Sequence, residues 1–204
     1  QRQWGISDSA GKILLEPKWD EIRAMFGDMF RLRKENKTTV YDIRTKKIIC
    51  VPGTGIVDYF NDDYFLVIQS EKMGLISRKG KQILPPVYDD IVNGNANCFL
   101  VRKGNKIGLA ATDGRELISP SYTSIMGFDG RVALTRQDNC FGAINDRGEV
   151  LVEAYQDTVI VKSDVIKIRG MGELKVLELA DGRVVGSTDY SKVKTIRVGS
   201  RVWS

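Results

Sequence analysis

One stretch decides the fold of this chain: residues 72–91, which read KMGLISRKGKQILPPVYDDI. It contains a short apolar run, a Gly-Lys turn, a second apolar run that meets two prolines, and a tyrosine. The turn glycine recurs along the chain at intervals of 34 or 35 residues, with a lysine in its place once. A period of this length is the signature of a repeat architecture, so the sequence predicts six copies. The turn slot holds Gly11, Lys46, Gly80, Gly114, Gly148 and Gly182.

Two further slots are apolar in all six copies, and we expect both to lie in the core. The third residue after the turn slot is Leu14, Ile49, Ile83, Leu117, Leu151 or Val185, and the eleventh is Ile22, Val57, Ile91, Ile125, Val159 or Val193. We therefore predict one all-β repeat domain over residues 1–204. Its approximate copies are residues 3–36, 37–71, 72–105, 106–139, 140–172 and 173–204.

Proline and an aromatic residue follow the first apolar slot. Because proline lacks an amide donor and restricts the residue before it, we expect the strand after the turn to stop there. The aromatic residue is then expected in a separate short segment, together with the second apolar slot. The prolines are Pro17, Pro52, Pro86 and Pro120, and the aromatic residues are Trp19, Tyr88, Tyr122 and Tyr190.

The short strands are expected to form a meander that crosses the boundary between copies, with almost no helix because no 3.6-residue period is sustained. Pairs such as Asp113-Gly114 and Asp181-Gly182 are typical of two-residue hairpins. A strand glycine precedes the turn in four copies and indicates close approach of another backbone. This slot holds Gly5, Val40, Gly74, Gly108, Gly142 and Val176.

These features resemble the WG-repeat family, bacterial proteins built of tandem β repeats. The resemblance is carried by Trp4-Gly5-Ile6, by the Gly11-Lys12 and Gly80-Lys81 turns, and by Pro85-Pro86 with the following Tyr88-Asp89. It extends over essentially the whole chain, although the Trp-Gly pair reads Thr39-Val40 and Lys175-Val176 in two copies. The family implies repeat architecture and assigns no chemistry.

The two ends of the chain are complementary in this scheme. The first copy lacks a strand before residues 3–8, whereas the last copy ends in a strand at residues 195–203 that lacks a successor. We therefore predict a propeller-like ring closed by the terminal strands, which removes exposed sheet edges. The alternative is an open superhelical β-repeat array. Since the chain does not begin with Met, we interpret it as processed or shortened.

Composition limits the chemistry. With 31 Lys and Arg against 26 Asp and Glu, the net charge is +5, a mild excess that favours anionic partners without requiring them. Histidine is absent, which removes Ser-His and Cys-His catalysis and His-containing zinc sites. The adjacent carboxylates Asp89-Asp90 and Asp20-Glu21 point to opposite faces of an extended segment and make poor acid/base couples. Cys50, Cys98 and Cys140 are expected to be buried apolar residues.

Charges recur at both ends of the predicted sheets. We expect the end with the Gly turns to carry mixed charges that neutralise themselves, and the opposite end to be the more basic. The more basic end is either a set of solvated strand ends or a binding site for an anionic glycan, peptide or protein. The candidate binding residues are Arg33, Lys34, Arg102, Lys103, Arg136 and Arg169.

A second candidate is the loop at residues 58–65, the densest mixture of aromatics and carboxylates in the chain. It reads either as a sugar-stacking or calcium-binding loop, or as an ordinary turn, because other copies carry turn formers there. Its spacing is not that of an EF-hand. The alternative site residues are Asp58, Tyr59, Asp62, Asp63 and Tyr64.

The sequence therefore favours a non-enzymatic binding or protein-interaction scaffold, without cofactor or metal, that acts as a monomer on a protein or an anionic glycan or peptide. The alternative is a glycan-binding or glycan-active propeller of the cell envelope. Nucleic acid is not expected as a partner because the aromatics occupy core slots. No apolar run is long enough for a membrane span. The free thiols favour the cytoplasm, whereas the missing start and the possible glycan ligand favour the cell envelope or secretion. We predict a location outside the cytoplasm.

Overall fold

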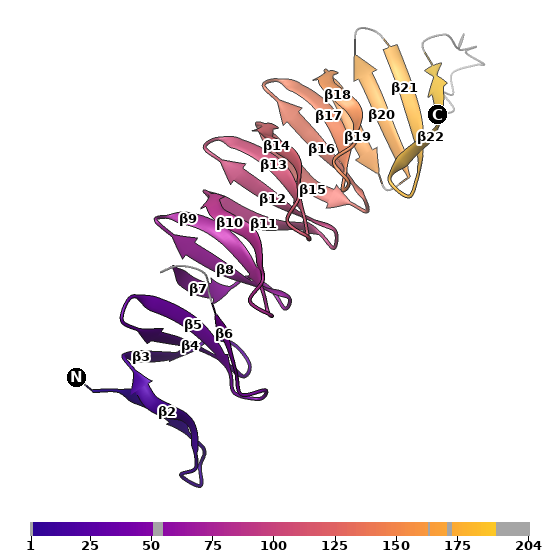
Figure 1. The fold of residues 1–204 in the computed structure, drawn as a ribbon. Helices are drawn as coiled ribbons and strands as arrows, with labels where there is room; N and C mark the ends of the chain where they lie inside the picture. Colours follow the sequence, from indigo (N-terminus) through magenta and orange to yellow (C-terminus); the bar gives the residue numbers. More distant parts are fainter. Residues whose placement is uncertain (1, 51–54, 163, 171–172, 191–204) are drawn as a thin grey trace, which may run out of the picture. The chain divides into compact units, whose positions relative to one another are not determined.

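The computed structural model describes residues 2–50, 55–162, 164–170 and 173–190, which form strands joined by short turns (Figure 1). None of these residues lies in an α-helix, so none belongs to a helix long and apolar enough to cross a membrane. The chain divides into two compact units, residues 1–91 with 101–104, and residues 92–100 with 105–204. We call them the first and second units.

The described strands form one two-stranded sheet and five four-stranded sheets, in which each strand pairs with its neighbours in chain order. The first unit contains β1 (Trp4–Ser7) and β2 (Ile13–Trp19), then β3 (Glu21–Ala24), β4 (Met29–Lys34), β5 (Lys37–Asp42) and β6 (Lys47–Cys50), and then β7 (Ile56–Tyr59), β8 (Tyr64–Gln69), β9 (Lys72–Ser77) and β10 (Gln82–Tyr88). Both units contribute to β11 (Asp90–Asn95), β12 (Cys98–Lys103), β13 (Lys106–Ala111) and β14 (Glu116–Tyr122). The second unit contains β15 (Ser124–Asp129), β16 (Val132–Gln137), β17 (Cys140–Asn145) and β18 (Val150–Gln156), and then β19 (Thr158–Lys162), β20 (Val165–Gly170), β21 (Glu173–Ala180) and β22 (Arg183–Asp189).

Each four-stranded sheet crosses a boundary between copies, as the sequence predicted. Its first two strands end one copy and its last two begin the next, so the turn between the second and third strands joins two copies. These turns are two-residue hairpins: Lys34 pairs with Lys37 and Gln137 with Cys140. Residues at these turns adopt positive φ, including Asp138 at 55°. The all-β meander is therefore confirmed, whereas the predicted closing strand, residues 195–203, lies outside the described residues.

The turns between the third and fourth strands follow the glycine slot. Gly80 has φ of 82°, and Lys46, which replaces glycine, has φ of 56°. The prediction of a two-residue turn is correct for Asp181-Gly182, where Ala180 pairs with Arg183. It is wrong for Asp113-Gly114. There the Ala111 amide donates to the Arg115 carbonyl at 2.8 Å, which makes a three-residue loop.

The prediction that proline stops the fourth strand is wrong. β10 runs through Pro85 and Pro86 to Tyr88, which ends the strand and is buried. This strand lies at the edge of its sheet, where a missing amide donor breaks no ladder bond on the outer side. The register slips instead: Leu84 pairs with Leu75 and Tyr88 with Met73, so the prolines lie in a bulge. The aromatic residue belongs to this strand, not to the segment that follows.

The strand glycine and this bulge require each other. A Cβ on Gly74 would lie 2.6 Å from the Leu84 carbonyl oxygen and 2.7 Å from the Pro86 nitrogen, and both are backbone atoms. Close approach is therefore confirmed. Where valine replaces the glycine the bulge is absent at that point: Val40 pairs with Ile49 in a regular ladder.

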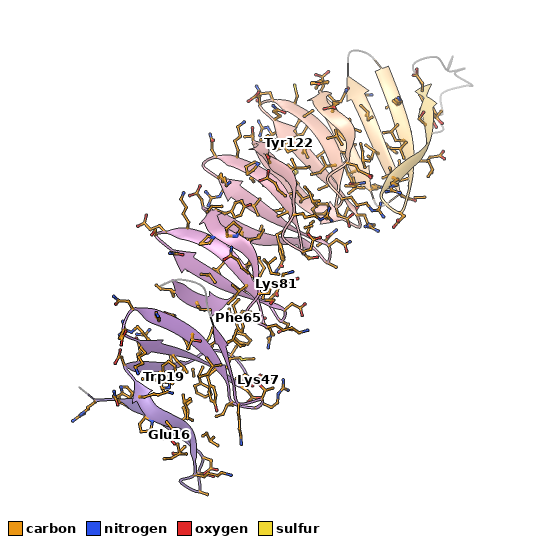
Figure 2. All side chains as sticks on the ribbon, in the orientation of Figure 1. Glu16, Trp19, Lys47, Phe65, Lys81 and Tyr122 are labelled. Atoms are coloured by element: carbon orange, nitrogen blue, oxygen red, sulfur yellow. The ribbon has the colours of Figure 1, made fainter. Side chains whose placement is uncertain are left out.

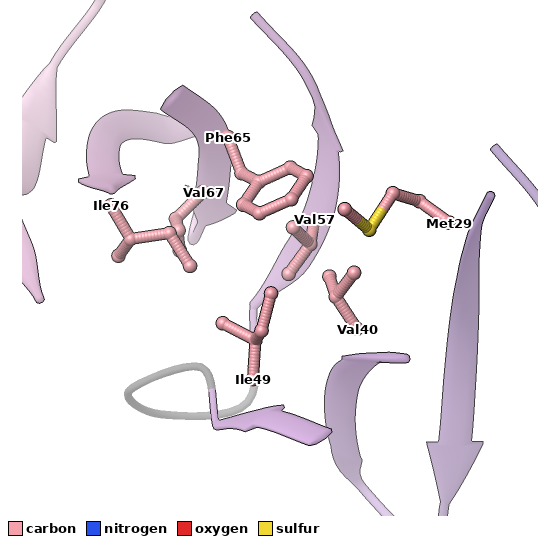
Figure 3. Packing of buried hydrophobic residues seen from close by; sticks show 7 residues of the cluster. All are labelled: Met29, Val40, Ile49, Val57, Phe65, Val67 and Ile76. Carbon is pink, nitrogen blue, oxygen red and sulfur yellow. The ribbon is translucent and has the colours of Figure 1, made fainter. Parts of the chain in front are cut away.

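Buried apolar side chains fill the space between neighbouring sheets. In the first unit one cluster joins β4 to β9, with Phe65 and Val57 at its centre (Figure 3). The eleventh-residue slot is buried at Val57, Ile91, Ile125 and Val159, as predicted. For the third-residue slot the prediction is correct only at Ile49 among the described copies. Elsewhere the slot is at best half-buried and Val185 is 66% exposed. The following residue is buried instead at Leu15, Leu84 and Val152.

Two cysteines are described with their surroundings. Cys98 is buried, as predicted, and burial raises the pKa of its thiol to about 11. Cys140 is half-buried. Cys98 is therefore a neutral packing residue and not a nucleophile.

Candidate functional site

A network of ion pairs covers the hairpin turns of the second unit. At its centre the Asp146 side chain has no exposed surface, and its Oδ2 accepts hydrogen bonds from Asn95 Nδ2 at 3.1 Å, Asn97 Nδ2 at 2.7 Å and Arg131 Nε at 3.0 Å. Burial raises the pKa of Asp146, but these donors lower it more, and the net pKa falls below its ordinary value. Asp146 is therefore a buried, fully paired carboxylate.

The same network links turns that lie one repeat apart. Arg147 Nη2 contacts Asp181 Oδ2 at 2.6 Å, and Arg131 Nη1 contacts Asp181 Oδ1 at 2.7 Å. Asn145 Nδ2 also donates to the Gly182 carbonyl at 3.0 Å. We call this network the stapled rim; it comprises Asn95, Asn97, Arg131, residues 145–149 and residues 181–183. It holds neighbouring turns together.

The corresponding slots of the first unit hold different charges. Two residues before the turn slot, where the second unit has Asp146, the first unit has Arg44 and Arg78. One residue after it, the second unit has Arg115, Glu149 and Arg183, and the first unit has Lys12, Lys47 and Lys81. The last two side chains lie at the turn ends of their sheets (Figure 2). Arg44 and Arg78 thus replace the carboxylate of Asp146, whereas the second slot carries cations in both units with Glu149 as the exception.

Three of these cations, Arg44, Lys47 and Arg78, line a groove of about 550 Å³, which we call the basic groove. Arg44, Lys47, Arg78 and Lys79 contribute the charge, and Asp42 is the carboxylate among the lining residues. That carboxylate is already engaged, because its Oδ1 accepts the backbone amides of Arg44 at 2.9 Å and Thr45 at 3.1 Å. Burial raises the pKa of Asp42, but these hydrogen bonds bring it below its ordinary value. The groove therefore has an excess of positive charge.

Arg78 is held in a fixed position at this groove. Its guanidinium carbon lies 5.2 Å from the ring centroid of Phe26 and 5.9 Å from that of Phe65. Its Nη2 lies 3.7 Å from Oδ1 of Asp62, whose side chain is 93% exposed. Its Nε is buried and has no hydrogen-bond partner among the described residues. Aromatic packing thus fixes a cation whose own counter-ion is weak.

The arginines predicted from the sequence at the opposite ends of the sheets have partners of their own. Arg33 Nε lies 3.1 Å from Glu21, Arg102 Nη2 lies 3.5 Å from Asp90, and Arg136 Nε donates to the Asp138 carbonyl at 2.8 Å. The six cations belong to both units.

The other three of these six cations have different surroundings. Lys34 lines a hollow next to Arg33, Lys103 lies 4.9 Å from the ring centroid of Tyr88, and Arg169 is exposed on β20. The role of all six in binding stays a prediction.

The carboxylates that precede the first strand of each sheet act as turn residues. Asp89 accepts a hydrogen bond from Lys72 and another from the Gly104 amide. These two bonds lower the pKa of Asp89. Asp89 therefore bonds to the turn between β12 and β13.

The loop candidate is a structured turn with one exposed aromatic face. Asn61 Oδ1 accepts the amides of Asp63 and Tyr64, as expected of a turn former. Tyr59 packs edge-on against Phe26 with ring centroids 4.1 Å apart, and its hydroxyl contacts Asp62 at 3.4 Å.

A shallow hollow of about 360 Å³ adjoins this loop, between Tyr59, Asp58, Arg23 and Arg31. Within the described ranges no group of three or more Cys, Asp or Glu side chains is placed to hold a metal ion.

Together these features define an all-β tandem-repeat protein of four-stranded antiparallel meanders with a charged rim. Two of its copies, residues 4–37 and 73–106, match the family described as WG containing repeat, so these copies are WG repeats, as the resemblance predicted. Comparison with curated protein sequences gave no match.

The solved structures similar to this chain are of propeller type. Hsv2 of Kluyveromyces lactis is 11% identical over 79% of this chain and 60% of that chain, with a TM-score of 0.35. PorZ of Porphyromonas gingivalis, a bacterial surface component of the type-IX secretion system, is 16% identical over 94% of this chain and 29% of that chain, with a TM-score of 0.32. Regucalcin of Agrobacterium tumefaciens is 14% identical over 80% of this chain and 72% of that chain, with a TM-score of 0.29. This chain thus spans less than two thirds of Hsv2 and of PorZ.

Proposed function

We propose that the protein is a non-enzymatic scaffold that binds an anionic segment of a protein partner in the basic groove. The observation that carries this proposal is the change of sign at equivalent slots. Asp146 staples the second unit, whereas Arg44 and Arg78 fill the same slot in the first unit and line the groove. An anionic partner would supply the charge that the second unit supplies from its own side chains.

The arrangement favours binding over catalysis. The lining carboxylate, Asp42, is tied to the backbone of its own turn, so it has no acid or base partner in the groove. Clustered cations attract an anionic segment over roughly one Debye length, about 8 Å at physiological ionic strength. Binding is therefore expected to be strongly salt-dependent.

The experiment is a titration of the protein with fluorescent polyglutamate, followed by anisotropy at ionic strengths of about 0.01 M and about 0.15 M. Changing Arg44, Lys47 and Lys79 together to Gln should weaken binding about tenfold or more, because each exposed ion pair contributes up to about 1 kcal/mol.

The charge-matched control changes the exposed Lys162, Lys167 and Lys175 of the second unit to Gln. It should leave the affinity unchanged. Equal affinities for the two variants would contradict the proposal. The variant Arg102→Gln, Lys103→Gln and Arg136→Gln tests the predicted basic end in the same assay.

A glycan is the second candidate ligand, and the hollow beside Tyr59 favours it. Tyr59 is 46% exposed, which leaves ring surface for a sugar to stack on, and Asp58 and Arg31 line the same hollow. Tyr59→Ala should abolish binding in a glycan screen while polyglutamate binding persists. A location outside the cytoplasm and a monomeric state stay predictions.

We also propose that the terminal strands close a ring. In support, β1 and β2 form a two-stranded sheet, whereas the other described sheets have four strands. The sequence predicts a strand at residues 195–203, and this strand would be the second neighbour of β1. Hydrogen exchange at residues 4–7 should accelerate in a chain that ends at residue 190. Unchanged exchange would contradict closure.

A further inference from the structure

We infer that the ligand of the basic groove is an acidic peptide segment with an apolar side chain next to its carboxylate, and that Arg78 is the anchor for that carboxylate. This inference rests on the proposed function and names its ligand. It distinguishes the groove from a general polyanion site.

Arg78 is preorganised for binding because two aromatic rings already hold its guanidinium in place. Phe26 and Phe65 hold its guanidinium by packing, so little side-chain freedom remains to be lost when a ligand binds. The buried Nε lacks a partner among the described residues, and the contact of Nη2 with the exposed Asp62 is long, at 3.7 Å. An incoming carboxylate can accept two parallel hydrogen bonds from the planar guanidinium, a geometry that lysine cannot offer.

The groove also has apolar surface beside the cations. Ile48 lies in the groove and is 45% exposed, whereas the next residue of the same strand, Ile49, points to the other face and is buried in the core. Met29 and Ile49 belong to the buried cluster of Figure 3 and also line the groove. A sulfated glycan or a purely acidic chain would leave Ile48 uncovered. A peptide with a leucine beside its carboxylate would bury both side chains.

The cations of the groove come from two different turn regions. Arg44 and Lys47 come from the β5–β6 turn, and Arg78 and Lys79 come from the β9–β10 turn. Cations from two turns therefore line one groove that also contains an apolar side. This pattern suits an extended segment in which acidic and apolar residues alternate.

The test compares a short synthetic peptide in which Glu and Leu alternate with polyglutamate of equal charge and with a sulfated glycan. The wild-type protein should bind the alternating peptide about tenfold more tightly than polyglutamate, since one well-placed apolar group is worth about tenfold or more. Ile48→Ser should remove this preference. Equal binding of the three probes would overturn the inference.

Arg78→Lys keeps the charge and removes the fork, so it should weaken binding of the alternating peptide about tenfold. Arg115→Lys, the same change at an exposed arginine of the second unit, is the matched control and should bind like the wild type. Asp62→Asn, which removes only the exposed partner of Arg78, should bind as tightly as the wild type or a few-fold more tightly. Circular dichroism confirms that each variant is folded before binding is measured.

The two failures are separable. If the variant with Arg44, Lys47 and Lys79 changed to Gln binds every probe like the wild type, the proposed function is wrong. If that variant loses affinity but the wild type does not prefer the alternating peptide, or if Arg78→Lys binds that peptide unchanged, only the inference about the ligand is wrong.

Discussion

Asp146 in the second unit and Arg78 in the first unit occupy the same slot, two residues before the turn glycine. Their side chains have opposite charge and different neighbours. Asp146 is buried and accepts hydrogen bonds from three side chains, whereas Arg78 packs on two aromatic rings and has a weak, exposed counter-ion. One slot of a repeat can therefore serve as a staple in one copy and as part of a groove in another.

The comparison teaches where binding capacity lies in this scaffold. Turn, strand glycine and bulge form the frame of the four copies that have the glycine, and this frame leaves the residues around the turn free to vary. Where those residues complement one another, as at Arg147 and Asp181, they hold neighbouring turns together. Where they have like charge, as at Arg44 and Lys47, the proposed anionic ligand would balance them.

The largest expected effect comes from removing the buried carboxylate of the stapled rim. Asp146→Ala removes the buried acceptor that Arg131, Asn95 and Asn97 share, and we expect a loss of about 3–5 kcal/mol in the free energy of unfolding. Urea denaturation measures it. Asp62→Ala in the first unit is the matched change and should cost about 0–1 kcal/mol, because its ion pair is exposed. Similar losses for the two variants would break the comparison.

The next effect tests whether the two units share one frame. Gly74→Ala in the first unit and Gly108→Ala in the second should each cost about 1–3 kcal/mol, because the new Cβ meets the nitrogen of Pro86 or Pro120 at 2.7 Å. Gly127→Ala, with no atom within 4 Å of the added Cβ, should change stability by less than about 0.5 kcal/mol. Unequal costs at Gly74 and Gly108 would mean that the units differ in more than rim charge.

Acid should weaken the stapled rim selectively. The folded-state pKa values of Asp146, Asp181 and Glu149 lie below their ordinary values of 3.8, 3.8 and 4.5. Their contribution to stability is therefore complete above these ordinary values and is lost as the pH falls through the lowered ones. Unfolding followed from pH 7 down to about pH 2 should show this loss, and Asp146→Asn should reduce it. An unchanged pH profile in that variant would contradict the role of Asp146.

The smallest effect is expected at the exposed part of the stapled rim. Asp181 is 66% exposed in its side chain, so Asp181→Asn should lower stability only slightly. The loss should shrink further in high salt, because screening already weakens the wild-type pair. A salt-independent loss would instead indicate that packing, not charge, joins the turns.

Much of the frame follows from the sequence. Equal spacing of the turn glycines predicts the copies, and the dipeptides between copies predict the meander that crosses their boundaries. The prediction that proline stops the fourth strand is wrong for a physical reason. Its missing amide matters only if the strand has a neighbour on that side, and β10 is an edge strand. Which strand lies at an edge depends on the whole sheet and not on the residues around Pro86.

The sequence predicts only part of the candidate site. Charges at the turn end were expected to cancel, which holds at Arg147 and Asp181 but not in the basic groove. Alignment of the turn slots alone would have shown Arg44 and Arg78 against Asp146. The packing of Arg78 on Phe26, a residue about fifty positions away, has no local sequence signal and needs the fold.

The most direct test of the central claim locates the ligand without any mutation. Two-dimensional NMR of the isotopically labelled protein, titrated with the alternating Glu and Leu peptide, reports each backbone amide separately. The account predicts that the amides of residues 42–48 and 78–80 shift, while those of residues 145–149 and 181–183 stay unchanged. Shifts at the stapled rim with none in the basic groove would contradict it.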